Sequence, residues 1–191
     1  MNKSYIVLLL LVSSISIIVS LSYTPNIFGF GWPYAQQDYP HQIGAAQFNE
    51  HQYIAYQSLT ANKTVDIFFQ ASHDNGSTFS NPIDLNDFMN KSTSSDYSAN
   101  PQVAAFNDDV YIIWHSKLSS GNVNLFYINS TDGGRTFGNA TNESYMNNPN
   151  HNTNLNVEHA VLLVDRITGS VFVAYTNDDG SVVPCHVHCD G

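Results

Sequence analysis

One short polar phrase occurs twice in this chain, and the copies hold one register. Ser-x-Asp-x-Gly-x-Thr-Phe begins at Ser72 and again at Ser130. The residues before the two phrases match at the same spacing without a gap, starting with Asp38-Tyr39 against Asp96-Tyr97. A repeat of this length predicts two copies of one structural unit. The phrases comprise Ser72, Asp74, Gly76, Thr78, Phe79, Ser130, Asp132, Gly134, Thr136 and Phe137.

Each repeat alternates short apolar runs with turn residues. In the second repeat the runs are 102–106, 110–116 and 123–129, and Pro82–Leu85 suggests a final short strand in the first. β-Branched and aromatic residues dominate, and no helical periodicity occurs, so we expect an all-β chain. About four antiparallel strands per repeat is the blade of a β-propeller. The strand aromatics expected in the blade cores are Tyr53, Tyr56, Phe68, Tyr111, Trp114 and Phe126.

A third repeat begins but is not completed. Ala160–Asp165 and Ser170–Asn177 match the first two strands of a blade, and no third phrase follows. Thr141–Asn156 is rich in Asn and weakly patterned, which predicts a long loop between units. The predicted segments are 1–22, a signal peptide or anchor; 23–38, a linker; 39–96, the first repeat; 97–156, the second repeat with its Asn-rich loop; 157–183, a partial third repeat; and 184–191, a Cys/His tail.

The first residues predict export from the cytoplasm. Lys3 precedes an apolar run from Tyr5 to about Val19, and the small residues Ser20 and Ser22 follow. This pattern is typical of a signal peptide, and the alternative is an uncleaved anchor in a membrane. In both cases the protein is secreted or lies at the cell surface. Asn-x-Ser/Thr sequons, which mark candidate glycosylation sites, occur at Asn62, Asn75, Asn90, Asn129, Asn139 and Asn142.

The charge balance excludes one class of partner. Six basic residues stand against sixteen acidic ones, which gives a formal net charge of −10. A phosphate backbone would be repelled, so no nucleic-acid partner is expected. Hydrophobic residues make up 42% of the chain, which is enough to bury a core.

Every residue type in the repeated phrase suits a tight hairpin turn. The glycines can adopt a positive φ, and the aspartates can accept hydrogen bonds from nearby backbone N–H groups. The Ser and Thr hydroxyls can bond across the turn, and we expect the closing Phe79 and Phe137 to turn inward to the core. None of these roles needs a nucleophile or a base. A structural role is therefore favoured over a catalytic one.

The phrase resembles the Asp-box, or bacterial neuraminidase repeat, of sialidases and other propellers. The resemblance covers roughly residues 38–180 and extends to the repeats of secreted archaeal sialidase-like proteins. It implies that the box lies in the hairpin between the third and fourth strands of a blade, far from the active site. Since the box occurs in hydrolases, binding proteins and structural propellers, it indicates the fold rather than the activity.

A sialidase, as the resemblance implies, holds the substrate carboxylate with three arginines and uses a Tyr–Glu pair and an Asp in catalysis. Arg135 and Arg166 are the only arginines in this sequence, and Arg135 lies inside the second box. We therefore predict no catalytic residues and no sialidase activity for this chain alone. A closed six-blade ring at this period needs about 350 residues. The chain is thus expected to be part of a longer propeller, to assemble as several copies through its unfinished sheet edges, or to form a small open sandwich.

The last residues concentrate metal-ligating side chains. On an extended strand His186 and His188 would share one face, which is a good two-point site for zinc or copper. Asp190 could add an oxygen, and in a bent loop Cys185 and Cys189 could ligate the metal together. The alternatives are a disulfide between Cys185 and Cys189, as expected in an oxidising compartment, or no site at all. The remaining histidines are interpreted as surface or loop residues: His41, His51, His73, His115, His151 and His159.

Three functions follow from these patterns. The leading hypothesis is a secreted or cell-surface Asp-box repeat protein that is not catalytic alone and that binds a glycan or another extracellular ligand, or assembles outside the cell. The first alternative is the N-terminal part of a propeller glycoside hydrolase of the exo-sialidase type. The second is an extracellular metal-binding protein that uses the C-terminal Cys/His cluster.

Overall fold

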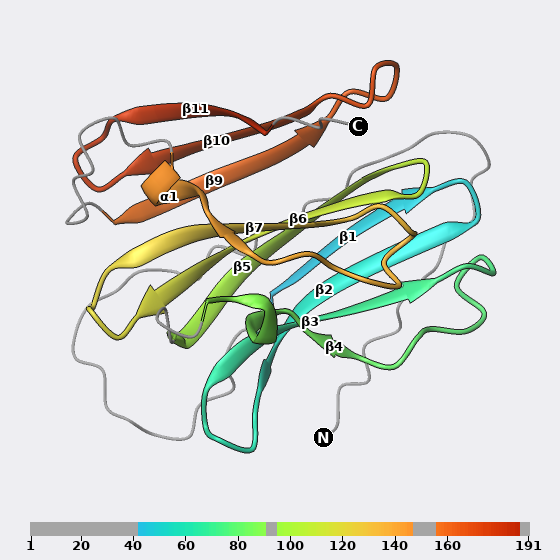
Figure 1. The fold of residues 1–191 in the computed structure, drawn as a ribbon, viewed down its shortest axis with the longest axis horizontal. Helices are drawn as coiled ribbons and strands as arrows, with labels where there is room; N and C mark the ends of the chain where they lie inside the picture. Colours follow the sequence, from blue (N-terminus) through green and yellow to red (C-terminus); the bar gives the residue numbers. More distant parts are fainter. Residues whose placement is uncertain (1–41, 91–94, 147–155, 188–191) are drawn as a thin grey trace, which may run out of the picture. The chain divides into compact units, whose positions relative to one another are not determined.

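The computed structural model describes residues 42–90, 95–146 and 156–187, which are almost entirely β-structure (Figure 1). The predicted fold class is confirmed, because the described strands form two four-stranded blade-like repeats and a partial third that do not close a ring. A single parallel pairing of Val65 with Tyr97 joins the first two repeats into one eight-stranded sheet, and the partial third is a separate three-stranded sheet. The predicted signal peptide or anchor and the linker lie outside these residues. None of the helices within the described ranges is long and apolar enough to cross a membrane.

The elements follow the repeat. The first blade contains β1 (Ile43–Phe48), β2 (His51–Leu59), β3 (Val65–Ser72), β4 (Ile83–Asp84) and the 3-10 helix η1 (Leu85–Phe88). The second contains β5 (Ser95–Phe106), β6 (Asp109–Leu118), β7 (Val123–Ser130), β8 (Thr141–Asn142) and α1 (Glu143–Met146). The third sheet contains β9 (Val157–Val164), β10 (Val171–Asn177) and β11 (Val182–Val187).

The first blade is a meander of antiparallel strands. β1 pairs with β2, β2 with β3, and β3 with the short β4. Side chains alternate between the two faces of a strand, so Tyr53, Ile67 and Phe69 share one face and are fully buried. Tyr56 and Phe68 lie on the opposite face and are half-buried. The two faces of this blade therefore differ in how completely they are covered.

The second blade repeats the first. β5 pairs with β6, β6 with β7, and β7 with β8. The pairing of Phe68 with Asp84 recurs at the repeat spacing as the pairing of Phe126 with Asn142. Residues 141–146, which the sequence predicted as the start of a loop, thus form the fourth strand and a single helical turn. Polar residues occupy this strand because it is short and lies at the edge of the blade.

The third sheet has one strand more than the sequence predicted. β10 pairs with β9 on one side and with β11 on the other, and both pairings are antiparallel. Cys185 and His186 belong to β11, opposite Val173 and Phe172. β11 thus extends through residues 184–187, which the sequence analysis assigned to a Cys/His tail.

A hydrophobic core lies between the first two blades rather than inside either one. The covered face of the first blade packs against Trp114 and its neighbours on the second, and Trp114 stacks on Phe126 with ring centroids 5.8 Å apart. Gln57 Nε2 donates to the carbonyl of Ser98 across the same contact at 3.0 Å. The buried residues are Tyr53, Ala55, Ile67, Phe69, Ala71, Leu85, Met89, Ala105, Val110, Ile112, Trp114, Phe126 and Ile128.

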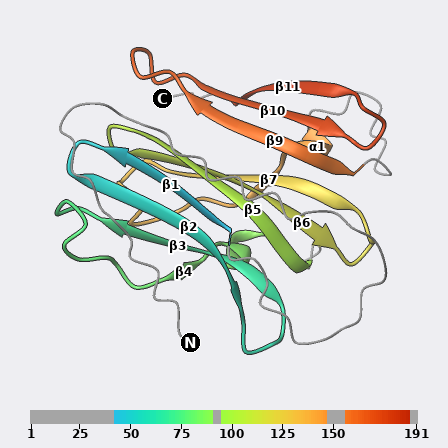
Figure 2. The same ribbon diagram turned by 180° about the vertical axis from the view of Figure 1, so that it is seen from behind.

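A second core joins the second blade to the third sheet, which lies alongside it in both views (Figures 1 and 2). Gln102 strengthens this contact in the manner of an extra strand: its Nε2 donates to Ala160 O at 2.6 Å, and its Oε1 accepts from Leu162 N at 3.0 Å. The buried residues are Ala104, Tyr111, Ile113, Leu125, Tyr127, Val157, Leu162, Val171, Val173 and Tyr175. Each core is thus made jointly by two successive sheets.

The outer face of the third sheet carries exposed apolar side chains. Leu163 is 53% exposed and Phe172 is 41% exposed, and Val161 and Val182 are exposed as well. The exposed residues of β9 and β10 alternate with buried ones, so both faces of the sheet carry apolar side chains, and one of them packs against the second blade.

Candidate functional site

The first Asp-box hairpin is closed by the carboxylate of Asp74. Its Oδ1 accepts from Ser72 Oγ at 2.7 Å and from Thr78 N at 2.8 Å, and its Oδ2 accepts from Thr78 Oγ1 at 2.6 Å. Ser72 Oγ in turn accepts from Gly76 N at 2.9 Å. Gly76 has a φ of 80°, which an L side chain rarely adopts. The three polar side chains of the phrase and the backbone N–H of its glycine are all used to hold the turn.

The second hairpin reproduces these contacts. Asp132 Oδ1 accepts from Ser130 Oγ at 2.7 Å and from Thr136 N at 2.9 Å, and Asp132 Oδ2 accepts from Thr136 Oγ1 at 2.6 Å. Ser130 Oγ accepts from Gly134 N at 2.9 Å. Arg135 donates from its guanidinium to the carbonyl of Asp132 at 2.6 Å. The side chain of Arg135 therefore stabilises the hairpin turn that contains it.

The hydrogen bonds fix the charge of both box carboxylates. The Thr78 hydroxyl and then its backbone N–H lower the pKa of Asp74 to about 2. The same two groups of Thr136 hold the pKa of Asp132 well below its usual range. Hydrogen bonds to the charged form have this effect in general. Both carboxylates are therefore ionised near neutral pH, which argues against their use as general acids at the boxes.

The two boxes differ in one respect that the sequence did not predict. Phe137 is partly buried, with its ring 5.0 Å from that of Phe69 and 6.0 Å from that of Phe88, both in the first blade. Phe79 is 40% exposed, so the expectation that it turns inward is wrong. Phe137 packs against the blade that precedes its own in the chain. The described residues contain no blade before the first one, so Phe79 has no such surface to pack against.

We expect the second box to contribute more to stability than the first. Asp132→Ala removes the acceptor of Thr136 N and its hydroxyl and loosens a hairpin that packs on the first blade. The expected loss in the free energy of unfolding is about 1–2 kcal/mol, discounted for exposure of the carboxylate. Urea unfolding of the purified protein measures it.

The matched control for this prediction is Asp74→Ala. It breaks the same hydrogen bonds in a hairpin whose Phe79 is exposed. A smaller loss is therefore expected. A loss equal to or larger than that of Asp132→Ala would contradict the assignment of the second box to the contact between blades.

A second group of acidic residues lies at β3, β4 and η1. Asn86 Nδ2 donates to Asp66 Oδ1 at 3.3 Å, and Asp84 Oδ1 accepts from Asn86 N at 2.9 Å. Burial, and then the nearby Asp66 carboxylate, raise the pKa of Asp84 to about 6. In the second blade the corresponding residues are Asn124 and Asn142. Since two asparagines take the same positions in the second blade, the carboxyl groups of Asp66 and Asp84 are not required for the blade to form. This supports a structural role for the two aspartates rather than a catalytic one.

The structure brings together two histidines that the sequence analysis assigned to separate surface or loop positions. The Nδ1 atoms of His51 and His73 lie 2.7 Å apart, and the ring centroids are 4.9 Å apart. His51 begins β2 and His73 follows β3, so antiparallel pairing of the two strands makes them neighbours. The hydroxyl of Tyr53, on the same face, is buried and has no hydrogen-bond partner. Only the strand register could have revealed this cluster.

His115 also departs from the expectation of a surface or loop residue. It is buried between the second blade and the third sheet, and neither ring nitrogen has a hydrogen-bond partner. Burial, and then the positive potential of His159, lower its pKa to about 4. The ring is therefore neutral at physiological pH.

The other candidate residues are placed as follows. The backbones of Cys185 and His186 lie in β11, whereas His188, Cys189 and Asp190 lie outside the described residues. The zinc or copper site and the alternative disulfide therefore remain predictions. Among the described residues no group of three His, Cys, Asp or Glu side chains is arranged to hold a metal ion. The sequons at Asn62, Asn75, Asn90 and Asn139 are exposed, and those at Asn129 and Asn142 are half-buried within strands.

No protein-family model matches the chain, and no curated protein matches its sequence. Among solved structures it is similar to a thermostable family-43 glycoside hydrolase, with 13% identity, a TM-score of 0.48, and coverage of 72% of this chain and 41% of that one. A Hadza microbial sialidase matches at 15% identity and a TM-score of 0.38, covering 73% and 31% of the two chains.

An α-L-arabinofuranosidase from Clostridium thermocellum matches at 14% identity and a TM-score of 0.37, covering 76% of this chain and 56% of that one. The chain thus spans about a third to a half of the length of these proteins.

Proposed function

We propose that this chain is a secreted or cell-surface Asp-box repeat protein that is not catalytic by itself and that works through assembly or binding outside the cell. The observation that carries the proposal is the stacked, half-buried pair of Tyr56 and Phe68 on the outer face of the first blade. Its partner would be another blade-shaped surface, in the first instance a second copy of this chain. A glycan or another extracellular ligand would then bind to the assembled form.

Repeat symmetry supports this use of the outer face. Tyr56 corresponds to Trp114 and Phe68 to Phe126 in the register of the two repeats. Both pairs are stacked, at 6.1 Å for the first and 5.8 Å for the second. The pair in the second blade is buried by the first blade, whereas the pair in the first is only half-buried. The first blade therefore carries a stacked aromatic pair on its outer face, at the position where a preceding blade would cover it.

The third sheet offers a complementary surface. Its exposed Phe172 and Leu163 lie on the face that points away from the second blade. The internal contacts pack each sheet on the next in one direction, so a second copy can continue the row head to tail. Such a heterologous contact closes into a ring or extends into a fibre. Exposed apolar faces of this kind are typical of interaction sites.

The assembly is tested by sedimentation equilibrium of the purified chain over a range of concentrations. The expected mass is a multiple of the single-chain mass. Tyr56→Ser/Phe68→Ser should reduce it to one copy, because these rings contribute the apolar area of the contact. Ile167→Ser is the control, since Ile167 is 90% exposed in a turn rather than on a sheet face.

If the double variant does not fold, Leu163→Ser/Phe172→Ser tests the opposite face with residues that are already exposed. A single-copy mass for the unmodified chain at every concentration would contradict assembly.

The proposed lack of sialidase activity rests on the number of arginines in the sequence. Arg135 donates to the backbone of its own box, and the sequence contains one other arginine, Arg166. A planar, bidentate clamp of three guanidinium groups cannot be built from two. Release of sialic acid from a glycoconjugate by the purified chain would contradict this part of the proposal.

The alternative is that the chain is the N-terminal part of a longer propeller glycoside hydrolase. Further blades of the same polypeptide would then cover the two outer faces. The intact mass of the protein isolated from its source separates the two cases: a mass well above 21.2 kDa favours the longer hydrolase.

A further inference from the structure

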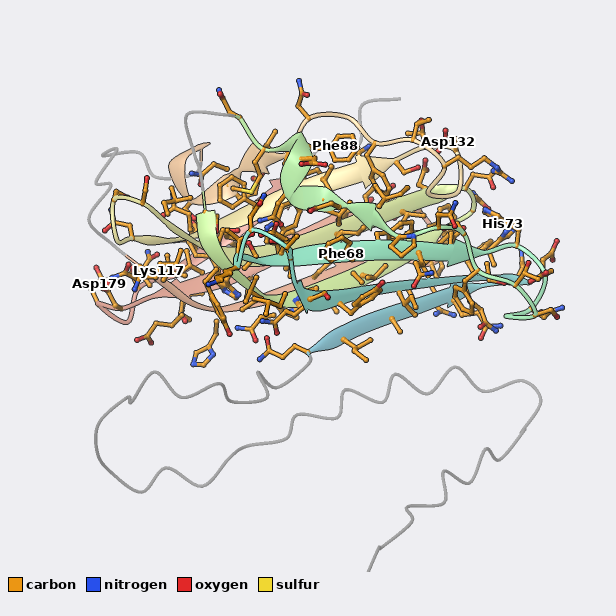
Figure 3. The ribbon with its side chains drawn as sticks, turned by 90° about the horizontal axis from the view of Figure 1, so that it is seen from below. Phe68, His73, Phe88, Lys117, Asp132 and Asp179 are labelled. Atoms are coloured by element: carbon orange, nitrogen blue, oxygen red, sulfur yellow. The ribbon has the colours of Figure 1, made fainter. Side chains whose placement is uncertain are left out.

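His51 and His73 form a pair of imidazoles whose Nδ1 atoms converge. They are neighbours across the β2–β3 pairing, on the face that also carries Tyr53. Figure 3 shows His73 toward the same end of the strands as Asp132 of the second box. We propose that His51 and His73 together bind one borderline transition-metal ion, Cu²⁺ or Zn²⁺, with Cu²⁺ held more tightly.

The geometry needs only a small movement. At 2.7 Å one Nδ1–H donates to the other Nδ1 lone pair. A tetrahedral ion with metal–nitrogen bonds near 2.0–2.1 Å holds two nitrogens roughly 3.3 Å apart. The rings must therefore separate by about 0.6 Å on metal binding. The proton between them moves to Nε2 of the donating ring, so two neutral imidazoles present two lone pairs to the metal.

A carboxylate lies near the second ring nitrogen of His51. Its Nε2 is 4.0 Å from Glu50 Oε1, which is longer than a hydrogen bond. Metal-ligating histidines commonly direct their second ring nitrogen to a carboxylate, which fixes the tautomer and raises the basicity of the ligating nitrogen. On metal binding at Nδ1, a change in the Glu50 side-chain rotamer would let it take this role.

The Arg135 guanidinium is the nearest described cation to consider at this site. A Cβ added to Gly133 would lie 3.0 Å from His73 Cε1 and 3.2 Å from Arg135 Nη1, so the two side chains are neighbours. Arg135 is engaged with the carbonyl of Asp132, which limits its movement toward the metal.

The buried hydroxyl of Tyr53 is the independent sign that the cluster is incomplete. Tyr53 is fully buried, and its oxygen has no hydrogen-bond partner, which is a costly arrangement in a folded protein. A water bound to the ion could satisfy it. Since the described residues offer no third His, Cys, Asp or Glu ligand, water must complete the coordination.

A depression open to solvent lies beside His73, and the His51 side chain is 21% exposed. The volume of the depression is about 300 Å³, and it is lined by Ala71, His73, Asp74, Thr78, Phe79 and Ser80. A hydrated ion is far smaller than this, so entry does not require the blades to separate.

The test uses the full chain with Cys185→Ser, His186→Ala, His188→Ala and Cys189→Ser, so that the C-terminal cluster cannot bind. Cu²⁺ or Zn²⁺ is added, excess ion is removed by dialysis, and bound metal is measured by elemental analysis. One equivalent is expected. His73→Thr should weaken binding by about 100-fold or more, because changes to residues behind a ligand already cost 10–100-fold.

The choice of threonine keeps the fold intact, since Thr131 occupies this position in the second box. His159→Asn, at an exposed position of β9, is the matched control and should retain the metal. If His73→Thr lowers the melting temperature without metal, His51→Gln replaces it. Cu²⁺ spectra should show coupling to two imidazole nitrogens.

Retention of a full equivalent by His73→Thr, coupling to a single imidazole, or no binding by the parent chain would each overturn the proposal. The result is independent of assembly, because both histidines belong to the first blade.

Discussion

Gly134→Ala is expected to lower the free energy of unfolding by about 2–5 kcal/mol, the sum of two effects. Gly134 has a φ of 79°, where an L residue is strained by about 1–2 kcal/mol. A Cβ at this position would lie 2.6 Å from the Cε1 and Cζ atoms of Phe69, and overpacking of a core costs about 1–3 kcal/mol. Phe69 cannot easily move, because its ring packs on Phe137 and Tyr53.

Gly76→Ala is the matched control at the same position of the first box. Its φ of 80° gives the same strain. The added Cβ would meet Gln52 Oε1, the end of a flexible side chain that can rotate away. A loss of only about 1–2 kcal/mol is expected. Both variants are measured by urea unfolding, with the slope compared to that of the unmodified protein. Equal losses would show that the second box is not held against the first blade.

Lowering the pH is expected to reduce the free energy of unfolding through the protonation of His115. Its pKa is about 4 in the fold, against an ordinary value of 6.5, because it is buried and near His159. Below pH 6.5 the unfolded chain takes up a proton that the folded chain refuses. The free energy of unfolding therefore falls as the pH drops from 6.5 to about 4, by about 3 kcal/mol in total. Unfolding curves at a series of pH values measure the change.

His115→Leu isolates this contribution. Leucine fills the apolar contact and removes two unpaired ring nitrogens, so the variant should be at least as stable at neutral pH. The loss between pH 6.5 and 4 should shrink in this variant. The comparison is needed because Asp84 acts oppositely in part of the same window: its raised pKa of about 6 adds stability as the pH falls toward 3.8. An unchanged pH dependence in His115→Leu would contradict the assignment.

The repeated unit was predictable because it depends on local chemistry. Turn residues at fixed spacing and alternating apolar runs indicated the hairpins and the blade strands. The contacts of Ser130, Asp132 and Thr136 require only residues within the same turn. Local rules of this kind hold in any context. The constant register between the two repeats then related the two blades before any tertiary contact was known.

The features that escaped prediction depend on neighbours far away in the sequence. Phe79 and Phe137 are identical in local context, and only the presence of a preceding blade buries the second of them. His51 and His73 meet because β2 and β3 pair in one register, which a single-residue slip would destroy. The pairing of 182–187 with β10 also depends on a strand that precedes it in the chain, and the sequence analysis considered an extended conformation for these residues without assigning them a partner strand.

The two cores described above also determine how the chain can fold. Each is built from the facing surfaces of successive sheets, so neither blade has a complete core when taken alone. Stability then resembles that of a linear array, in which each unit depends chiefly on its nearest neighbours. The second blade takes part in both cores, so it couples the folding of the first blade to that of the third sheet. Unfolding of the second blade would therefore remove the packing surface of both neighbours.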